Sequence, residues 1–137
     1  MTIELYYLLL TAILVAVLWI PHIVGQVMTT GPLTPEDYVK LRKQGDFPNW
    51  VRRANRAHIN AVEQFGPFMA LILIAHMVQV SNSVTIWAAA IFFWARVVHA
   101  VVMIAGISRV MLRTVIFTVA FLCLMALAWQ IIANTNM

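Results

Sequence analysis

The chain has 137 residues, of which 63% are apolar and only 10% are charged. Soluble domains carry about 25% charged residues, so these charges are too few to cover a water-facing surface, and the mean hydropathy of +0.88 indicates a membrane as the solvent. The net charge of +4 does not indicate nucleic-acid binding, because the basic residues lie in short links between apolar runs, where they orient membrane helices. The length suits a single domain, residues 1–137.

Four apolar runs predict an all-α, integral membrane four-helix bundle with a left-handed, antiparallel up-down topology. No charged side chain occurs between Glu4 and Glu36, whereas a membrane-spanning helix needs only about 20 residues. No Lys or Arg precedes this first apolar run, so we expect it to remain in the mature protein rather than to act as a cleaved signal. The predicted spans are residues 5–27, 54–80, 84–107 and 112–133.

The first span contains Pro21, which is expected to kink its helix. The link after it, residues 29–50, is rich in glycine, proline and charged residues and is predicted to be a polar loop. Within this loop Thr34 precedes a proline as an N-cap residue does, and a short surface helix is predicted over Pro35–Lys43.

The second link, residues 81–83, is a short uncharged turn, and Gly106 is expected to help end the third span. Apart from Arg96 in the third span, every Lys and Arg lies in the first or third link or at the start of the second span: Lys40, Arg42, Lys43, Arg52, Arg53, Arg56, Arg109 and Arg113. The positive-inside rule then predicts that both of these links are cytoplasmic and that both termini lie outside.

Two of the spans carry polar side chains at membrane depth, where such groups are costly and usually face the bundle interior. Arg56, Asn60 and Glu63 share one helical face of the second span, because they are four and three residues apart. Arg96 and His99 likewise share a face of the third span. At a rise of about 1.5 Å per residue, Glu63 and Arg96 lie roughly 14 and 17 Å from the cytoplasmic ends of their spans, which predicts an ion pair.

Arg113 begins the fourth span at the mouth of the same region, so these groups are predicted to converge on one polar pocket in the cytoplasmic half of the bundle. A buried Glu–Arg pair by itself is also compatible with a purely structural role in fixing helix register. Arginines at the mouth suit a carboxylate or a phosphate, and a deeper carboxylate suits an ammonium group. A zwitterionic peptide such as glutathione has both kinds of group and so fits the arginines as well as the carboxylate, although the residues alone do not single it out.

Other chemistries have little support in the sequence. His58, His76 and His99 do not share a helical face with Glu63 in a metal-ligand spacing, so no metal site is predicted. Cys123 is isolated in the last apolar run, and no serine lies beside a histidine and an acid. Any nucleophile should therefore come from the ligand, and nearby positive charge such as that of Arg113 would favour a thiolate.

Several motifs resemble those of the MAPEG family, the membrane-associated proteins in eicosanoid and glutathione metabolism. Residues 56–63, with the sequence RAHINAVE, and the following Pro67-Phe68 resemble its signature. Residues 96–99, RVVH, resemble its second motif, and Arg113-Thr114 resembles its arginine-hydroxyl pair. Gly25-Gln26-Val27 and Pro35-Glu36-Asp37 resemble the prostaglandin E synthase branch, which is related to the microsomal glutathione transferases.

The resemblance implies a bacterial-type member in the inner membrane, assembled as a homotrimer among membrane lipids, that binds glutathione between protomers at the cytoplasmic side. It implies a glutathione-dependent transferase or peroxidase acting on lipophilic small molecules. In that reading Arg113 is the catalytic residue that activates the thiol. The residues implied to bind or shape the glutathione site are Arg56, Asn60, Glu63, Arg96, His99 and Thr114.

The chain departs from the prostaglandin E synthase branch at four positions. Met28 and Ile59 stand where that branch has arginines, and Met103 and Phe117 stand where it has tyrosines. Each missing arginine removes charge-assisted hydrogen bonds worth about 1.5–3 kcal/mol, for which Arg53 and Arg109 are candidate substitutes. A second hypothesis is therefore a MAPEG-fold protein without glutathione chemistry, serving as a lipid-binding or structural subunit. A transporter is disfavoured because no polar path crosses the membrane.

Overall fold

A computed structural model describes residues 1–40, 42–107 and 111–135 of the chain, and this described part is helical with no strand. Four helical stretches are long and apolar enough to cross a membrane, which confirms the predicted all-α, four-helix fold class. The elements are α1 (Ile3–Val17), α2 (Ile20–Thr30), α3 (Pro35–Val39), η1 (Gln44–Asp46), α4 (Asn49–Met77), α5 (Ser83–Ala105) and α6 (Leu112–Asn134).

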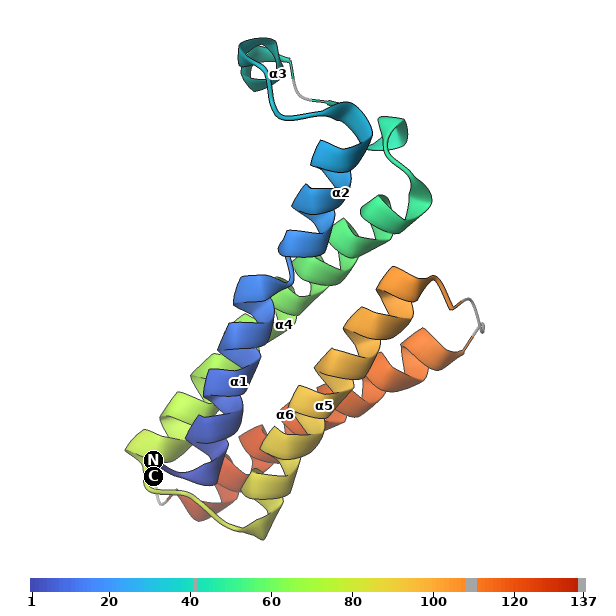
Figure 1. Ribbon diagram of the computed structural model, residues 1–137. Coiled ribbons are helices and arrows are strands. Elements are labelled where there is room, and N and C mark those ends of the chain that lie inside the picture. The colour runs from blue at the N-terminus through green and yellow to red at the C-terminus, as the bar shows by residue number, and fades with distance from the viewer. Residues whose placement is uncertain (41, 108–110, 136–137) are drawn as a thin grey trace.

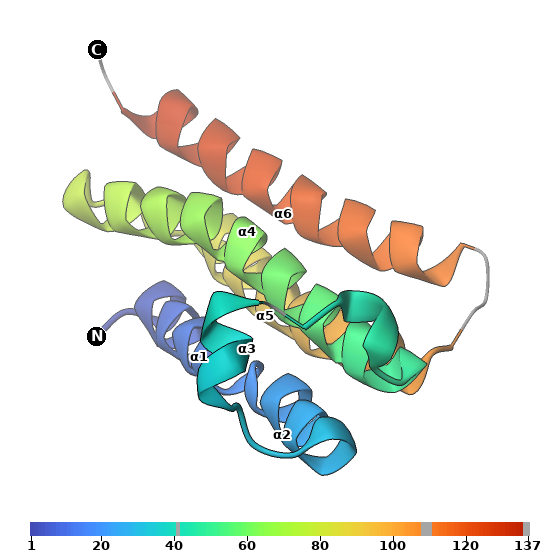
Figure 2. The same ribbon diagram turned by 90° about the horizontal axis from the view of Figure 1, so that it is seen from above.

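The long helices alternate in direction, so that the start of α1, the end of α4, the start of α5 and the end of α6 lie at one end of the bundle (Figure 1). The α2–α4 link and α3 extend beyond the opposite end. Helix α5 packs against α1, α4 and α6, and in the view from above α1 and α6 lie on opposite sides of α4 (Figure 2). Half of the residues in the apolar segment of α5 are buried, a larger share than in any other span. Helix α5 is therefore the central helix of the bundle.

The first span is broken rather than continuous. Helix α1 ends at Val17, and α2 begins at Ile20 with Pro21 in its first turn. Proline has no N–H to bond the carbonyl four residues earlier, but its fixed φ suits the first turn of a new helix. The kink predicted at Pro21 is thus confirmed, in the form of a short interruption between two helices.

Local capping sets both ends of α5. The Asn82 side chain accepts hydrogen bonds from the backbone N–H groups of Val84, at 2.9 Å, and Thr85, at 3.1 Å. At the other end Gly106 adopts a left-handed conformation with φ of 73°, which glycine reaches without a Cβ clash. The predicted role of Gly106 in ending the third span is confirmed.

The core where α4, α5 and α6 meet is closely packed. The rings of Phe68 and Phe92 stack with their centroids 4.0 Å apart, and both residues are fully buried. Ala88, Ala89 and Ala120 are buried around them. Small side chains let helix backbones approach closely, which is how helices associate where lipid supplies no hydrophobic driving force.

The α2–α4 link is organised by Arg42. Its guanidinium donates to both carboxylate oxygens of Asp37, at 2.7 and 2.6 Å, and to the carbonyls of Gly31 and Pro32, at 3.1 Å each. It also donates to the Thr30 hydroxyl. This bidentate pair holds the pKa of Asp37 well below its ordinary value and raises the pKa of Arg42.

The capping of α3 is confirmed, but its predicted length is wrong. The Asp37 carboxylate accepts hydrogen bonds from the Thr34 N–H and hydroxyl, at 2.8 Å each, as in a capping box. The helix ends at Val39, because Lys40 has extended backbone angles. The chain turns back there, and the turn brings Arg42 against Asp37, whereas a helix continued to Lys43 would carry it away.

Candidate functional site

A pocket of about 330 Å³ opens along one side of α4, and we call it the α4 pocket. It is lined by Arg56, Ile59, Asn60, Glu63, His99 and Met103. Four of the residues predicted from the sequence are therefore brought together: Arg56, Asn60, Glu63 and His99. The one-face spacing on α4 and the adjacent position of α5 account for this arrangement.

The four predicted residues differ in exposure. His99 is 6% exposed, and Asn60 is half-buried. Arg56 and Glu63 lie exposed on the outer side of α4. The pocket thus combines a buried imidazole and an amide at its base with a guanidinium and a carboxylate that face outward from the chain.

The predicted ion pair between Glu63 and Arg96 does not form. Arg96 is 3% exposed and its Nη1 atom donates instead to Oδ1 of Asn60, at 2.9 Å. The reason is the rotation of α4, whose buried face carries Ala57 and Ala61. Glu63 follows Ala61 by two residues, which is about 200° around a helix. Its carboxylate therefore points away from the interior that Arg96 occupies, while Asn60 lies at the border.

Arg96 is only partly satisfied within the described chain. Its Nε and Nη2 atoms are buried without a hydrogen-bond partner, and its guanidinium carbon lies 6.0 Å from the centre of the Phe92 ring. A buried cation with free donors is costly unless an acceptor reaches it. The site is therefore suited to receive an acceptor from a ligand or from another protomer.

The two residues at the start of α6 do not line the α4 pocket. Arg113 is half-buried, and its buried Nε atom has no hydrogen-bond partner among the described residues; Thr114 is exposed. Arg96 reaches the α4 pocket only through Asn60. The predicted convergence of all these groups on a single pocket is thus incomplete in one chain. Arg109, the other basic residue of that link, lies outside the described residues.

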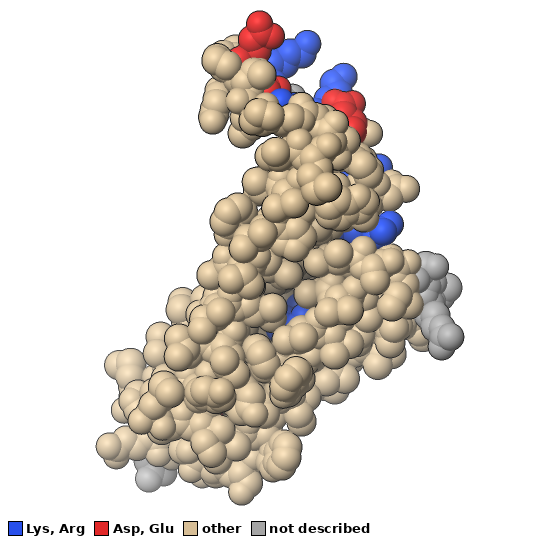
Figure 3. Space-filling view, in the orientation of Figure 1, with Lys and Arg blue, Asp and Glu red and all other residues tan. Residues whose placement is uncertain are grey.

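A second, basic pocket of about 630 Å³ adjoins the first and shares Arg56 and Ile59 with it. Its remaining lining residues are Asn49, Arg52, Arg53 and Asn55. The helix begins at Asn49, earlier than the span predicted at residue 54, so these arginines lie on α4 itself. In the space-filling view basic side chains gather towards the α3 end, and further blue atoms are recessed in a hollow below them (Figure 3).

Arg53 has a structural role that its position in the sequence does not reveal. Its Nε atom donates to the carbonyl of Ile104, at 3.2 Å. A Cβ atom on Gly106 would lie 2.6 Å from the Arg53 guanidinium carbon, so the absence of a side chain on this glycine makes room for the arginine. Arg53 therefore ties the start of α4 to the end of α5. Its one-turn spacing from Arg56 was visible in the sequence, but its partner was not.

Fold and site together define an integral membrane protein with four membrane-spanning stretches and a polar pocket beside α4 near the end of the bundle that carries α3. The family comparison agrees with this class. The model of the MAPEG family matches residues 4–133, and the chain belongs to that family. Comparisons with curated proteins and with solved structures each gave no match.

Proposed function

We propose that the protein is a membrane-bound, glutathione-dependent transferase or peroxidase acting on lipophilic electrophiles, with glutathione bound in the α4 pocket. One observation carries the proposal: in a chain of the MAPEG family, the pocket unites Arg56, Asn60, Glu63 and His99. These residues are a cation, an amide, an anion and an imidazole, a set that suits a zwitterionic peptide.

The chemistry of glutathione matches this set group by group. Its carboxylates suit the Arg56 guanidinium, which offers paired N–H donors. Its ammonium group suits the Glu63 carboxylate, which is exposed and has no ion-pair partner among the described residues. The Asn60 amide, whose oxygen accepts from Arg96, still has an NH₂ group that suits a carbonyl oxygen of the peptide.

In the transferase reaction the thiol loses its proton to solvent or to a base, and the thiolate sulfur attacks an electrophilic carbon. A C–S bond forms while the leaving group departs with its electron pair. In the peroxidase reaction two thiols are oxidised to a disulfide as a hydroperoxide is reduced to an alcohol and water. We assign stabilisation of the thiolate to Arg113, because nearby positive charge lowers the pKa of a thiol.

Arg113 does not line the α4 pocket of its own chain, and this separation supports a site completed by a second protomer. Arg56 and Glu63 also face outward from the chain. In the homotrimer that we propose, the start of α6 of one protomer lies beside α4 of the next. The trimer then brings Arg113 and Thr114 to the bound peptide.

Lipophilic substrates reach such a site from the bilayer. An apolar groove of about 380 Å³ runs between α5 and α6 and is lined by Trp87, Trp94, Val98 and Val115 among others. Val115 and Arg113 both lie in the first turn of α6, so the groove ends at the same depth of the bundle as Arg113. We place the α4 pocket on the cytoplasmic side and both termini outside, because the basic residues of the α2–α4 link suit the cytoplasmic face.

A second candidate function rests on two lining residues. Ile59 and Met103 line the α4 pocket where the prostaglandin E synthase branch is expected to place an arginine and a tyrosine. An apolar rim suits an acyl chain or another subunit better than a charged peptide. The alternative is therefore a MAPEG protein without glutathione chemistry that binds lipid or stabilises a membrane complex.

Calorimetry of the purified protein with glutathione distinguishes the two functions. We expect saturable binding that is lost in Glu63→Gln, which removes the charge and keeps the shape. Glu36→Gln is the matched control, because Glu36 is exposed on α3 and does not line the α4 pocket. Absence of saturable glutathione binding, together with no turnover of a halonitrobenzene, would contradict the proposed enzymatic function and support the lipid-binding alternative.

A further inference from the structure

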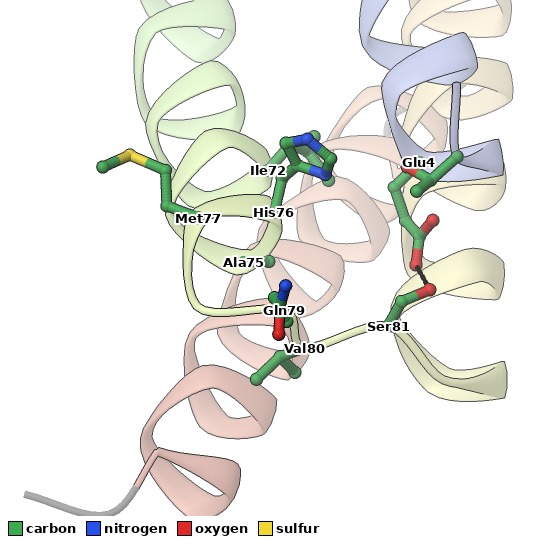
Figure 4. Close-up of a pocket in the computed structure, with 9 residues that line it drawn as sticks. Glu4, Ile72, Ala75, His76, Met77, Gln79, Val80 and Ser81 are labelled. Carbon is green, nitrogen blue, oxygen red and sulfur yellow. Dashed lines mark hydrogen bonds between the residues drawn. The ribbon is translucent and has the colours of Figure 1, made fainter.

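A separate polar pocket lies at the other end of the bundle, where α1 begins and α4 ends (Figure 4). It has a volume of about 350 Å³, and we call it the Glu4 pocket. Glu4 and Ser81 lie on one side of it, and His76 and Gln79 lie on the other. None of these residues belongs to the α4 pocket, so this site is independent of the proposed function.

The carboxylate of Glu4 is held in place and yet incompletely partnered. Glu4 is 4% exposed, and its Oε1 atom accepts hydrogen bonds from the hydroxyls of Ser81 and Thr85, at 2.7 Å each. Its Oε2 atom is buried with no hydrogen-bond partner. A carboxylate oxygen offers two lone pairs, and leaving such a group unpaired when buried is costly. The fold therefore positions an acceptor for which the described chain supplies no donor.

No cation of the described chain neutralises this carboxylate. Arg42–Asp37, at the far end, is the one ion pair found among the described residues, so the amino group of Met1 is not paired with Glu4. The pocket lining contains neither Lys nor Arg. The last turn of α4 also ends here, and a helix C-terminus carries a partial negative charge of about half a unit. The local field thus favours a positively charged occupant.

The helices that meet at this pocket are long enough to cross a membrane, so their ends lie at the depth of the lipid headgroups. A protonated primary amine placed there has three N–H donors for carboxylate, amide and hydroxyl oxygens. We propose that the Glu4 pocket binds a primary ammonium group, supplied either by an ethanolamine lipid headgroup or by a free amine. A trimethylammonium group has no N–H donor and is expected to be rejected.

The test uses the purified full-length protein with two probes. In the lipid arm, mixed micelles hold equal amounts of ethanolamine and choline phospholipids with identical acyl chains, and mass spectrometry counts the lipids that remain bound. In the soluble arm, labelled ethanolamine or choline is titrated at constant ionic strength. We expect about tenfold or greater preference for the primary amine, as one charge-assisted hydrogen bond provides. Enrichment in the lipid arm alone identifies a lipid headgroup, and saturable binding in the soluble arm alone identifies a free amine.

Glu4→Gln removes the charge but retains an oxygen that accepts from Ser81 and Thr85, and it should abolish the preference. Glu36→Gln, an exposed acid on α3, should leave the preference unchanged. Equal retention of choline and ethanolamine probes by the wild type overturns the proposal even if Glu4→Gln does not fold. Equal preference in wild type and a folded Glu4→Gln also overturns it. Loss of glutathione binding by any variant has no bearing on these outcomes, so this proposal and the proposed function fail separately.

Discussion

The Nη1 atom of Arg96 on α5 lies 2.9 Å from the Oδ1 atom of Asn60 on α4, and this hydrogen bond joins two helices at the base of the α4 pocket. It makes Asn60 the neutral partner of a buried cation, while the carboxylate of Glu63 remains on the outer side of α4. Asn60 therefore joins α4 to α5, whereas Glu63 faces outward, where we propose that glutathione binds.

This difference predicts that substitution of Asn60 mainly lowers stability, whereas substitution of Glu63 mainly impairs binding. Asn60→Ala should lower the free energy of unfolding by about 1.5–3 kcal/mol, because it removes a hydrogen bond to a charged group. Glu63→Gln should leave that free energy nearly unchanged while impairing glutathione binding. Denaturant unfolding in detergent measures the first quantity and calorimetry the second. Equal destabilisation by both substitutions would indicate that Glu63 pairs with Arg96 after all.

The α2–α4 link is expected to loosen in acid. The pKa of Asp37 in the folded protein is lowered below its ordinary value of 3.8 by Arg42. A lowered folded pKa contributes stability that is present above pH 3.8 and is lost as the pH falls through the folded value. The protection factors of amides in the link, which compare observed with intrinsic exchange at the same pH, should therefore fall on acidification below about pH 4.

Arg42→Gln provides the control for this acid effect. It removes the guanidinium that donates to Asp37, Gly31 and Pro32, so protection in the link should already be low near neutral pH and should change little on acidification. An unaltered acid transition in Arg42→Gln would show that another group titrates.

Two glycine substitutions should act in opposite directions. Gly106→Ala forces a side chain into a left-handed conformation, which costs about 1–2 kcal/mol, and its Cβ would lie 2.6 Å from the Arg53 guanidinium carbon. Gly66→Ala lies inside α4 with nothing within 4 Å of the new Cβ, and should stabilise by roughly 0.5–1 kcal/mol. Thermal unfolding of both variants measures the difference, and a stabilising Gly106→Ala would contradict the cap geometry.

Arg113 is expected to act on the thiol rather than on peptide affinity. Arg113→Leu should slow turnover most at low pH and move the rising limb of the pH–rate profile upward, with about tenfold lost per unit of thiol pKa. Arg113→Lys should restore part of the rate. Equal slowing at every pH, or loss of glutathione binding, would assign Arg113 to positioning or binding instead.

The proposed topology is testable by labelling in a Cys123→Ala background. Ser83→Cys and Lys43→Cys replace exposed residues near opposite ends of the bundle. An impermeant maleimide should label Ser83→Cys on intact cells and Lys43→Cys only after the membrane is opened. The reverse pattern would place the α4 pocket on the outer side.

The four membrane spans could be predicted from the sequence, because composition and the length of the apolar runs specify them without reference to tertiary contacts. The sequence also located the break at Pro21 and the end of α5 at Gly106, where backbone conformation depends on the residue itself. The shared face of Arg56, Asn60 and Glu63 follows from helical periodicity alone.

The hydrogen-bond partners of these residues could not be predicted in this way, because they depend on how the helices pack. The rotation of α4 about its axis gives Asn60 to Arg96 and turns Glu63 outward, and equal depth along two helices does not specify that rotation. Likewise, Thr85 donates to Glu4 across 81 positions of sequence. Helical spacing is a local property, whereas the choice between nearby acceptors depends on packed faces that the whole bundle sets.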